Sequence, residues 1–339
     1  MSMKTCVLII NLGTPEAPTP GAVGRYLREF LGDKRVIDIP WLARKILVNG
    51  IIAPTRKYKS SKEYKKVWTP EGSPLLLITQ ELQNLLAERF KTDDVTIEMA
   101  MRYGEPSMEK VLQRMELGRY DKVVVFPLYP QYASATTGST IEEAFRLISR
   151  WYVIPEVVAI SQFWDHPGYL NALQLTASGI DLSHYDHIVM SYHGLPERQV
   201  DKVYEDKMCS NHSCETEINE ENRFCYVATC YATSRELANK LSLDASRYTV
   251  CFQSRLSKDW VKPFSDDVIR ELGEQGKKRV LVFSPAFVAD CLETIVEIGE
   301  GYLELFQEHG GEQLDLVPSL NTSSAWVDAL EQMIRSRIA

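Results

Sequence analysis

A histidine at position 193 stands where an apolar run gives way to a turn. In the stretch SYHGLPER, His193 follows an apolar run and precedes Gly194 and Pro196, two residue types that favour turns. A neutral imidazole can accept a proton near neutral pH, so this position suits a general base at the end of a strand. A structural or merely exposed histidine is the alternative, and the residue type alone does not exclude it.

A row of acids follows another apolar run, in SPAFVADCLETIVEIGEGYLELF. Glu293 and Glu297 are four residues apart, and Glu300 lies seven residues after Glu293. On a helix all three carboxylates would share one face. Carboxylates that lead into a cleft suit a divalent cation, whereas a solvated acidic face is the alternative interpretation.

A third stretch, FPLYPQYASATTGST, places Tyr129 and Tyr132 beside small and hydroxylated residues before a predicted helix. It suits either an anion held by backbone donors or a tight loop. The chain lacks the glycine patterns GxGxxG and the P-loop, which disfavours nucleotide binding.

Four of the seven cysteines lie in the polar segment 207–230. Cys209, Cys214, Cys225 and Cys230 have the spacing C-x4-C-x10-C-x4-C, wider than the C-x2-C of most structural zinc sites. Four thiolates suit either zinc or a [2Fe–2S] cluster. The remaining cysteines, at positions 6, 251 and 291, lie in or beside apolar strands and are expected in the core.

Composition limits the setting in which these groups work. The net charge of −8 argues against general nucleic-acid binding. The apolar run at the N-terminus is too short for a signal peptide, and no run reaches the ~18 residues of a membrane span. We therefore expect a cytoplasmic protein, in which disulfides are rare and clustered cysteines favour a metal.

The segment 41–66 departs from the acidic balance, with eight Lys and Arg against one acid. Large apolar residues such as Trp41, Leu42 and Ile46 are interleaved with these charges. The pattern is typical of a lip that rests on an anionic membrane, and equally of a solvated helix packed by its apolar side.

Short β-rich runs alternate with helical segments along the chain, which predicts βα units around parallel sheets. Four runs in the first half and three in the second read as strands. The sequence therefore predicts an α/β fold of two similar Rossmann-like halves with a cleft between them. The expected divisions are 1–155, 156–320 and a final helix in 321–339 that packs back.

In such sheets, ligands bind beyond the carboxyl ends of the strands. That rule selects the segments 11–15, 102–104, 129–139 and 191–196, and a cleft would collect them all.

Several motifs in order resemble the ferrochelatase family: NLGTPEAPTPGAVGRYLREFLGD, MRYGEPS, YPQYASATTGST, SYHGLPER, FQSRLSKDWVKPFSDD and FVADCLET. The resemblance spans nearly the whole chain. It implies two four-stranded parallel halves, each flanked by helices, around a porphyrin cleft. It also implies a lyase that inserts Fe²⁺ into protoporphyrin IX to form protohaem, the terminal step of haem biosynthesis.

The resemblance also assigns roles to single residues. His193 matches the family's cleft histidine and Glu293 the glutamate opposite it, with Glu297 behind it on a path for departing protons or entering iron. Three further side chains are expected to bind substrate. Tyr132 matches a cleft tyrosine, and Arg102 and Tyr103 match a polar pair near the metal site. Asn11, after the first strand, is a further substrate-binding candidate. In related enzymes a third acid follows Glu297 by four positions, but here that residue is Gly301.

The resemblance implies that the lip at 41–66 touches the membrane, so the protein would be peripheral to the inner face of the cytoplasmic membrane. The cysteine-rich segment is similar to that of a class with an internal [2Fe–2S] cluster, and structural zinc is the alternative. Cys230 sits where some relatives without a cluster also have cysteine. Relatives include monomers and homodimers.

Three other functions stay open from the sequence. A coproporphyrin-using member is the nearest, and a chelatase for cobalt or nickel would typically show more histidines in its cleft. A haem or iron–sulfur sensor would bind without turnover.

Overall fold

The computed structural model describes residues 3–338, which divide into two compact units. Unit 1 is formed by the chain up to Tyr129, by Ala133–Gln162 and by the residues from Val327 onward. Unit 2 comprises Pro130–Tyr132 and Phe163–Trp326. The chain thus passes from unit 1 to unit 2 after Gln162 and back after Trp326, whereas the sequence suggested divisions at 155 and 320.

Unit 1 is built on a parallel four-stranded sheet in the order β2-β1-β3-β4. Its strands are β1 (Thr5–Thr14), β2 (Val95–Gly104), β3 (Lys122–Pro127) and β4 (Glu156–Ala159). β1 is central, and its residues 6–10 are fully buried because helices cover both faces of the sheet. The carboxyl ends of β1, β2 and β3 therefore meet at one edge.

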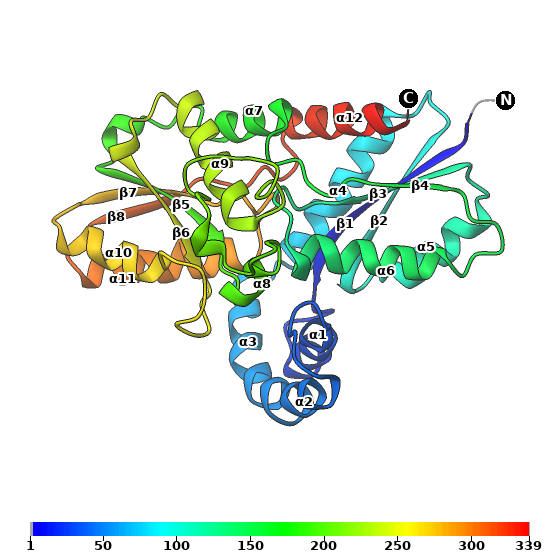
Figure 1. Cartoon of the computed structure of the whole chain (residues 1–339), viewed down its shortest axis with the longest axis horizontal. Helices are drawn as coiled ribbons and strands as arrows, with labels where there is room; N and C mark the ends of the chain where they lie inside the picture. Colours follow the sequence, from blue (N-terminus) through cyan, green and yellow to red (C-terminus); the bar gives the residue numbers. More distant parts are fainter. Residues whose placement is uncertain (1–2, 339) are drawn as a thin grey trace. The chain divides into compact units, whose positions relative to one another are not determined.

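Helices cover both faces of this sheet, α4 and α12 on one and α5 and α6 on the other (Figure 1). A helical hairpin of α1 and α3 extends from the carboxyl edge. The helical segments of unit 1 are α1 (Pro20–Gly32), α2 (Trp41–Ile46), η1 (Leu47–Ile52), α3 (Ala53–Val67), α4 (Pro74–Arg89), α5 (Met108–Leu117), η2 (Ser134–Gly138), α6 (Ser139–Ile148) and most of α12 (Ser324–Ile338).

Unit 2 repeats the arrangement with a parallel sheet in the order β6-β5-β7-β8. Its strands are β5 (His187–His193), β6 (Tyr248–Gln253), β7 (Arg279–Phe283) and β8 (Gln313–Leu316). The predicted fold class is confirmed by these two parallel four-stranded sheets. β8 has no counterpart among the runs recognised in the second half of the sequence.

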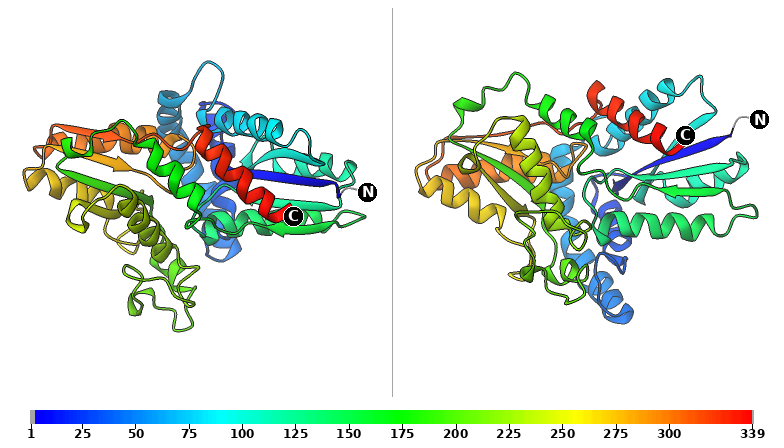
Figure 2. Two further views of the ribbon diagram at one scale, coloured as in Figure 1. Left: turned by 90° about the horizontal axis from the view of Figure 1, so that it is seen from above. Right: turned by 45° about the horizontal axis from the view of Figure 1, so that its top comes forward.

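In unit 2, α7 and α9 cover one face of the sheet, and α10 and α11 cover the other (Figure 1). The segment between α8 and α9 forms loops that stand away from this sheet (Figure 2). The helical segments are α7 (Pro167–Thr176), η3 (Leu182–His184), α8 (Glu197–Asp201), η4 (Cys209–Asn211), α9 (Tyr226–Lys240), η5 (Ala245–Arg247), α10 (Ser265–Glu274), η6 (Glu293–Tyr302) and α11 (Leu303–Glu308).

Three segments, η1, η2 and η6, are π-helical, with hydrogen bonds that span five residues instead of four. Each lies in a stretch that the sequence singled out: the lip, the loop after β3 and the acidic row. η2 runs directly into α6, which begins at Ser139. None of the helices within residues 3–338 has the length and apolarity needed to cross a bilayer.

Candidate functional site

His193 is the last residue of β5 and pairs in register with Gln253, the last residue of β6. Its side chain is partly buried, and its Nδ1 lies 2.7 Å from the carbonyl oxygen of Gly194. A carbonyl oxygen can only accept, so Nδ1 carries the proton that is donated. In the neutral ring, Nε2 is therefore the atom with a free lone pair, as a base requires.

Gly194 is needed because two backbones approach closely at this strand end. Its amide donates to the carbonyl oxygen of Gln253 at 2.8 Å. A Cβ atom at position 194 would stand 2.8 Å from that oxygen and 3.2 Å from the ring of Trp260. The glycine of the HG motif thus lets the chain after His193 lie directly against the end of β6. This close approach is the physical reason for glycine in the turn that the sequence predicts.

Glu297, the second acid of the row, is a partly buried carboxylate on η6. Its Oε2 accepts a hydrogen bond of 2.5 Å from Ser254 Oγ. Burial raises the pKa of the Glu297 carboxyl; Glu293 acts in the same direction, while Ser254 and His193 oppose the rise. The positive charge of His193 thus stabilises the carboxylate form of Glu297.

Ser254, which sequence reasoning missed, holds this carboxylate from a left-handed backbone with φ of 63°. Only a few per cent of residues other than glycine adopt such a conformation, and it recurs at functional sites. The motif FQSR contains Ser254, but the residue types in this motif do not predict a positive φ. The position directly after the last residue of β6 was the available signal.

The π-helix decides which acids share a face. Residues five apart overlap along it, so Tyr302 lies behind Glu297, and its hydroxyl reaches Oε1 at 3.5 Å. Glu293 is partly buried one turn earlier, whereas Glu300 is exposed. The expectation that Glu300 shares the face of Glu293 and Glu297 assumed α-helical spacing, which η6 does not have.

His193, Glu293 and Glu297 do not form a tight group of ligands. Within residues 3–338, the sets of three or more acidic, histidine or cysteine side chains whose ligand atoms lie within 4.8 Å of one another include only one trio, and it is made of cysteines.

In unit 1, Arg102 and Tyr103 belong to a buried network at the end of β2. Arg102 donates to Asp33 Oδ2 at 2.7 Å and to Ser139 Oγ at 2.8 Å, and the Tyr103 hydroxyl donates to Asp33 at 2.9 Å. Burial alone would raise the pKa of the Asp33 carboxyl, but hydrogen bonds from Ser139 and the Arg35 backbone, with the Arg102 charge, hold it below its usual range.

Two predicted substrate contacts are enclosed by the chain itself. Tyr103 is 1% exposed, so it shapes the site through Asp33 and does not offer a surface. Asn11 is also buried, and its amide is used locally: Nδ2 donates to Thr79 and Oδ1 accepts from the Leu12 amide. Tyr132 is partly buried and meets the ring of Phe224 edge-on, with centroids 6.0 Å apart.

Three of the four clustered cysteines come together. The Sγ atoms of Cys209, Cys214 and Cys225 are separated by 3.6, 3.9 and 4.0 Å. A tetrahedral metal with bonds to sulfur of about 2.3 Å holds its sulfurs about 3.8 Å apart. The donor type and the spacing of this cysteine triad therefore fit a thiolate-bound metal.

Cys230, the predicted fourth ligand, is not brought to this group. Cys225 precedes α9, whereas Cys230 is in the second turn of α9 and is fully buried beside Tyr226. The helix turns its thiol toward the core. The cysteines at positions 6, 251 and 291 are buried, as expected of core residues.

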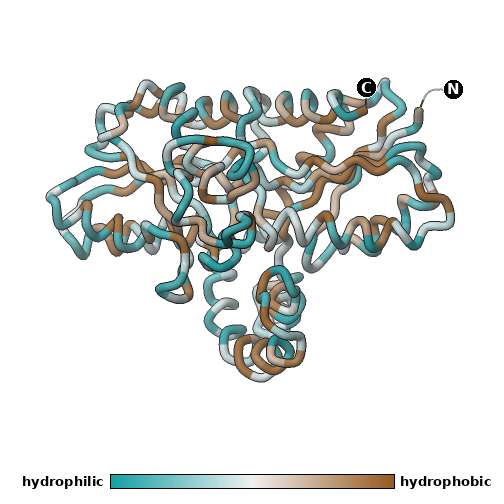
Figure 3. Tube along the Cα trace, viewed as in Figure 1, coloured by the Kyte–Doolittle hydropathy of each residue, from teal (hydrophilic) through white to brown (hydrophobic). Residues whose placement is uncertain are grey.

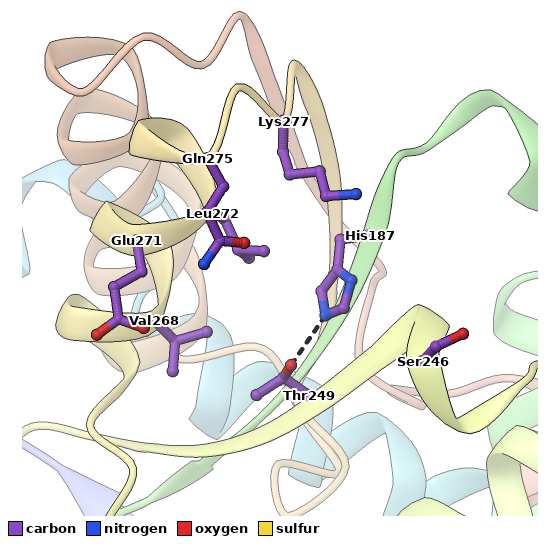
Figure 4. Close-up of a pocket in the computed structure, with 8 residues that line it drawn as sticks. All are labelled: His187, Ser246, Thr249, Val268, Glu271, Leu272, Gln275 and Lys277. Atoms are coloured by element: carbon purple, nitrogen blue, oxygen red, sulfur yellow. Dashed lines mark hydrogen bonds between the residues drawn. The ribbon is translucent and has the colours of Figure 1, made fainter.

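A pocket of about 290 Å³ lies at the opposite edge of the unit 2 sheet, beside the first residue of β5 (Figure 4). His187, Thr249 and Lys277 are among its lining residues, and His187 Nε2 lies 2.9 Å from Thr249 Oγ1. It faces the amino ends of the strands, where parallel sheets rarely bind substrates.

Comparison with known proteins gives one consistent result for the sequence. The family model named Ferrochelatase matches residues 4–338. A protein named Ferrochelatase from Legionella pneumophila (strain Corby) is 41% identical over 337 residues, which cover 99% of this chain and 100% of the relative. Its counterpart from Coxiella burnetii (strain CbuK_Q154) is 40% identical over 338 residues, 99% of this chain and 94% of the relative.

Solved structures show the same fold at low identity. SirB from Bacillus subtilis with Fe³⁺ matches with a TM-score of 0.55 and 14% identity, over 99% of this chain and 96% of that chain. CbiX, described as the terminal enzyme for biosynthesis of siroheme in denitrifying bacteria, matches with a TM-score of 0.50 and 13% identity, over 98% and 99%. These likenesses concern the arrangement of sheets and helices alone.

Proposed function

The chain belongs to the ferrochelatase family, and on that premise we propose that His193 and Glu297, with Glu293, carry its chemistry. The reaction is the insertion of Fe²⁺ into protoporphyrin IX to form protohaem, the terminal step of haem biosynthesis, and the enzyme is a lyase. Porphyrin nitrogens must lose two protons before they bind the metal, so the enzyme needs a base and a route by which protons leave.

The observation that carries the proposal is the position of Glu297 in unit 2, because its carboxylate accepts from Ser254, the residue after Gln253, which pairs in register with His193. His193 keeps its Nε2 lone pair free because Nδ1–H is donated to Gly194. It takes a pyrrole proton at Nε2, and the resulting imidazolium is stabilised by the carboxylate of Glu297. A carboxyl whose pKa is raised by burial is well matched to accept that proton in turn.

Glu293 and Glu297 are proposed to line one path on η6, for protons that leave or iron that enters. Tyr132 is retained as the proposed porphyrin contact. Arg102, with a side chain 15% exposed, is proposed to act with Asp33 as a fixed charge pair near the substrate. Tyr103 and Asn11 would contribute by holding the ends of their strands, because their polar atoms are already used within the chain.

Attachment to a membrane surface is supported by the end of the α1–α3 hairpin. Trp41, Leu42 and Ile46 are each about 60% exposed. Figure 3 shows hydrophobic stretches at the end of this hairpin. Lys45 lies over the Trp41 ring at 4.9 Å, whereas Arg44 turns inward to the carbonyls of Ile37 and Ile39. We propose that this lip rests on the inner face of the cytoplasmic membrane.

We expect the double variant Leu42→Ser, Ile46→Ser to bind anionic vesicles at least about tenfold more weakly than the wild type, since two apolar side chains lose their burial. Vesicle sedimentation at low and high salt measures the effect, and wild-type binding should weaken with salt. The matched control is Leu117→Ser, Val153→Ser, which removes apolar residues of similar or greater exposure elsewhere in unit 1. Equal binding by all three proteins would contradict the proposed lip.

For the cysteine triad we propose a [2Fe–2S] cluster, as in the internal class that the segment resembles. In a [2Fe–2S] cluster each iron has two protein ligands, so the triad would need a fourth donor. One of its three thiolates would bind the second iron and would have to lie farther from the other two. The nearly equal spacing of the three sulfurs favours the second candidate, a zinc ion, which needs only one more donor. Either group would cross-link the segment, and the cluster alone would add one-electron chemistry.

One absorbance experiment tests the activity and the metal together. The freshly purified full-length enzyme is scanned and then mixed anaerobically with Fe²⁺ and protoporphyrin IX. We expect visible iron–sulfur bands before the addition and conversion of porphyrin bands to haem bands after it. A colourless, zinc-containing protein that makes haem would select zinc, and no haem from protoporphyrin would overturn the substrate assignment and direct the test to coproporphyrin.

A further inference from the structure

Tyr204 lies over the cysteine triad, in a position that neither the sequence nor the family resemblance singled out. It follows α8 and is 4% exposed. Its hydroxyl oxygen is 2.8 Å from Cys214 Sγ. A metal-bound thiolate has no proton to give, so in a loaded site the phenol must be the donor.

The ring of Tyr204 packs against a residue that is itself held in place. It is stacked on the imidazole of His212, with centroids 3.9 Å apart and planes 16° from parallel. His212 in turn lies between two carboxylates, with Nε2 3.2 Å from Asp206 and Nδ1 3.4 Å from Glu221. A buried phenol clamped in this way is pre-oriented toward the sulfur.

The surrounding charge explains why a donor is needed there. The stretch 204–221 carries six carboxylates and, apart from His212, a single basic residue, Lys207. Three thiolates exceed the charge of one divalent ion, and the neighbouring acids add to the negative potential. A hydrogen bond to sulfur disperses part of this charge and makes a bound metal harder to lose.

We propose that Tyr204 is a positioning residue for the metal centre, and that its O–H···S bond to Cys214 increases metal retention. The inference rests on the proposed metal centre at the triad and concerns no step of haem formation. If the group is a [2Fe–2S] cluster, the same bond raises its reduction potential, because it stabilises the more negative reduced form.

The test compares the full-length wild type with Tyr204→Phe, which keeps the ring and its stack on His212 and removes only the hydroxyl. Metal content per chain is measured as purified, and metal loss is then followed in excess EDTA. We expect Tyr204→Phe to lose metal about 10- to 100-fold faster than the wild type. The matched control is Tyr185→Phe, another buried tyrosine of unit 2, whose hydroxyl donates to Asp315 at 2.6 Å.

A second protein separates donation from shape and does not depend on the stability of Tyr204→Phe. Site-specific 3-fluorotyrosine at position 204 makes the hydroxyl a stronger donor with almost no change in size. We expect it to slow metal loss relative to the wild type, opposite in direction to phenylalanine. Metal loss at the wild-type rate in both proteins would overturn the role of Tyr204, whereas a wild type without bound metal would overturn the centre itself and Tyr204's role with it.

Discussion

Replacing His193 by alanine is expected to abolish most haem formation and leave protoporphyrin binding intact. The imidazole offers Nε2 as the proton acceptor, and a positioned general base contributes about 10² to 10⁴ in rate. The side chain is partly buried at a strand end, so its loss does not remove a core residue. We would measure kcat anaerobically by the conversion of porphyrin to haem, and porphyrin affinity by quenching of protein fluorescence.

His184 provides a matched control, because it is an exposed histidine of the same unit and His184→Ala should turn over normally. Restoration of activity to His193→Ala by added imidazole would support the proposed role further. An unchanged rate in His193→Ala would remove His193 from the mechanism and assign the proton transfer to another group.

Glu297→Gln is expected to lower kcat by about 10² while making the protein more stable at neutral pH. Burial raises the pKa of the Glu297 carboxyl, so the folded state holds the proton more tightly than the unfolded chain does. Stability is therefore highest in acid and falls as the pH rises from the ordinary glutamate range to the raised pKa. Glutamine has no charge to bury, so Glu297→Gln does not lose stability at this site as the pH rises.

The measurement is a pair of thermal unfolding series between about pH 4 and pH 8, with kcat at each pH. The melting temperature of Glu297→Gln should exceed that of the wild type at pH 8, and the two should converge near pH 4. In the wild type, kcat should fall as the pH drops through the raised pKa, since only the carboxylate accepts a proton. Glu300→Gln, an exposed acid of the same helix, is the control. A variant less stable than the wild type at pH 8 would show that Glu297 is held mainly by its hydrogen bonds.

The fold could be predicted from the sequence because most strands are recognisable as apolar runs. Runs such as residues 6–10 of β1 are apolar throughout, as strands buried on both faces must be. β8 escaped recognition because it is only four residues long, QLDL, and alternates polar and apolar residues at the edge of its sheet. Periodicity over so few residues does not separate a strand from a loop.

The candidate site was only partly predictable, because residue type does not report backbone conformation. His193 and Glu297 stand in motifs whose spacing points to strand ends and helix faces. Ser254 holds Glu297 from a backbone with positive φ, and a serine in the sequence does not predict that conformation. The sequence predicts Tyr103 near the substrate, but it does not show that the hydroxyl donates to Asp33.

The cysteines illustrate the same limit. Their spacing along the chain predicts a common site, yet Cys225, directly before α9, joins Cys209 and Cys214, whereas Cys230, in the second turn of α9, does not. Tyr204 could not be found from the sequence, because tyrosine is not a usual partner of thiolates in any motif. Its role depends on the loop that brings residue 204 over residue 214.

The π-helical form of η6 has an evolutionary consequence. A π-helix arises when an α-helix gains a residue in a turn, and a deletion reverses the change. A lineage could therefore rotate Glu297 about the helix axis by single-codon insertions or deletions, without altering any residue of the β-sheet. Such a rotation changes which acids of η6 face His193. The number and order of carboxylates beside the histidine can therefore differ among proteins that share this fold.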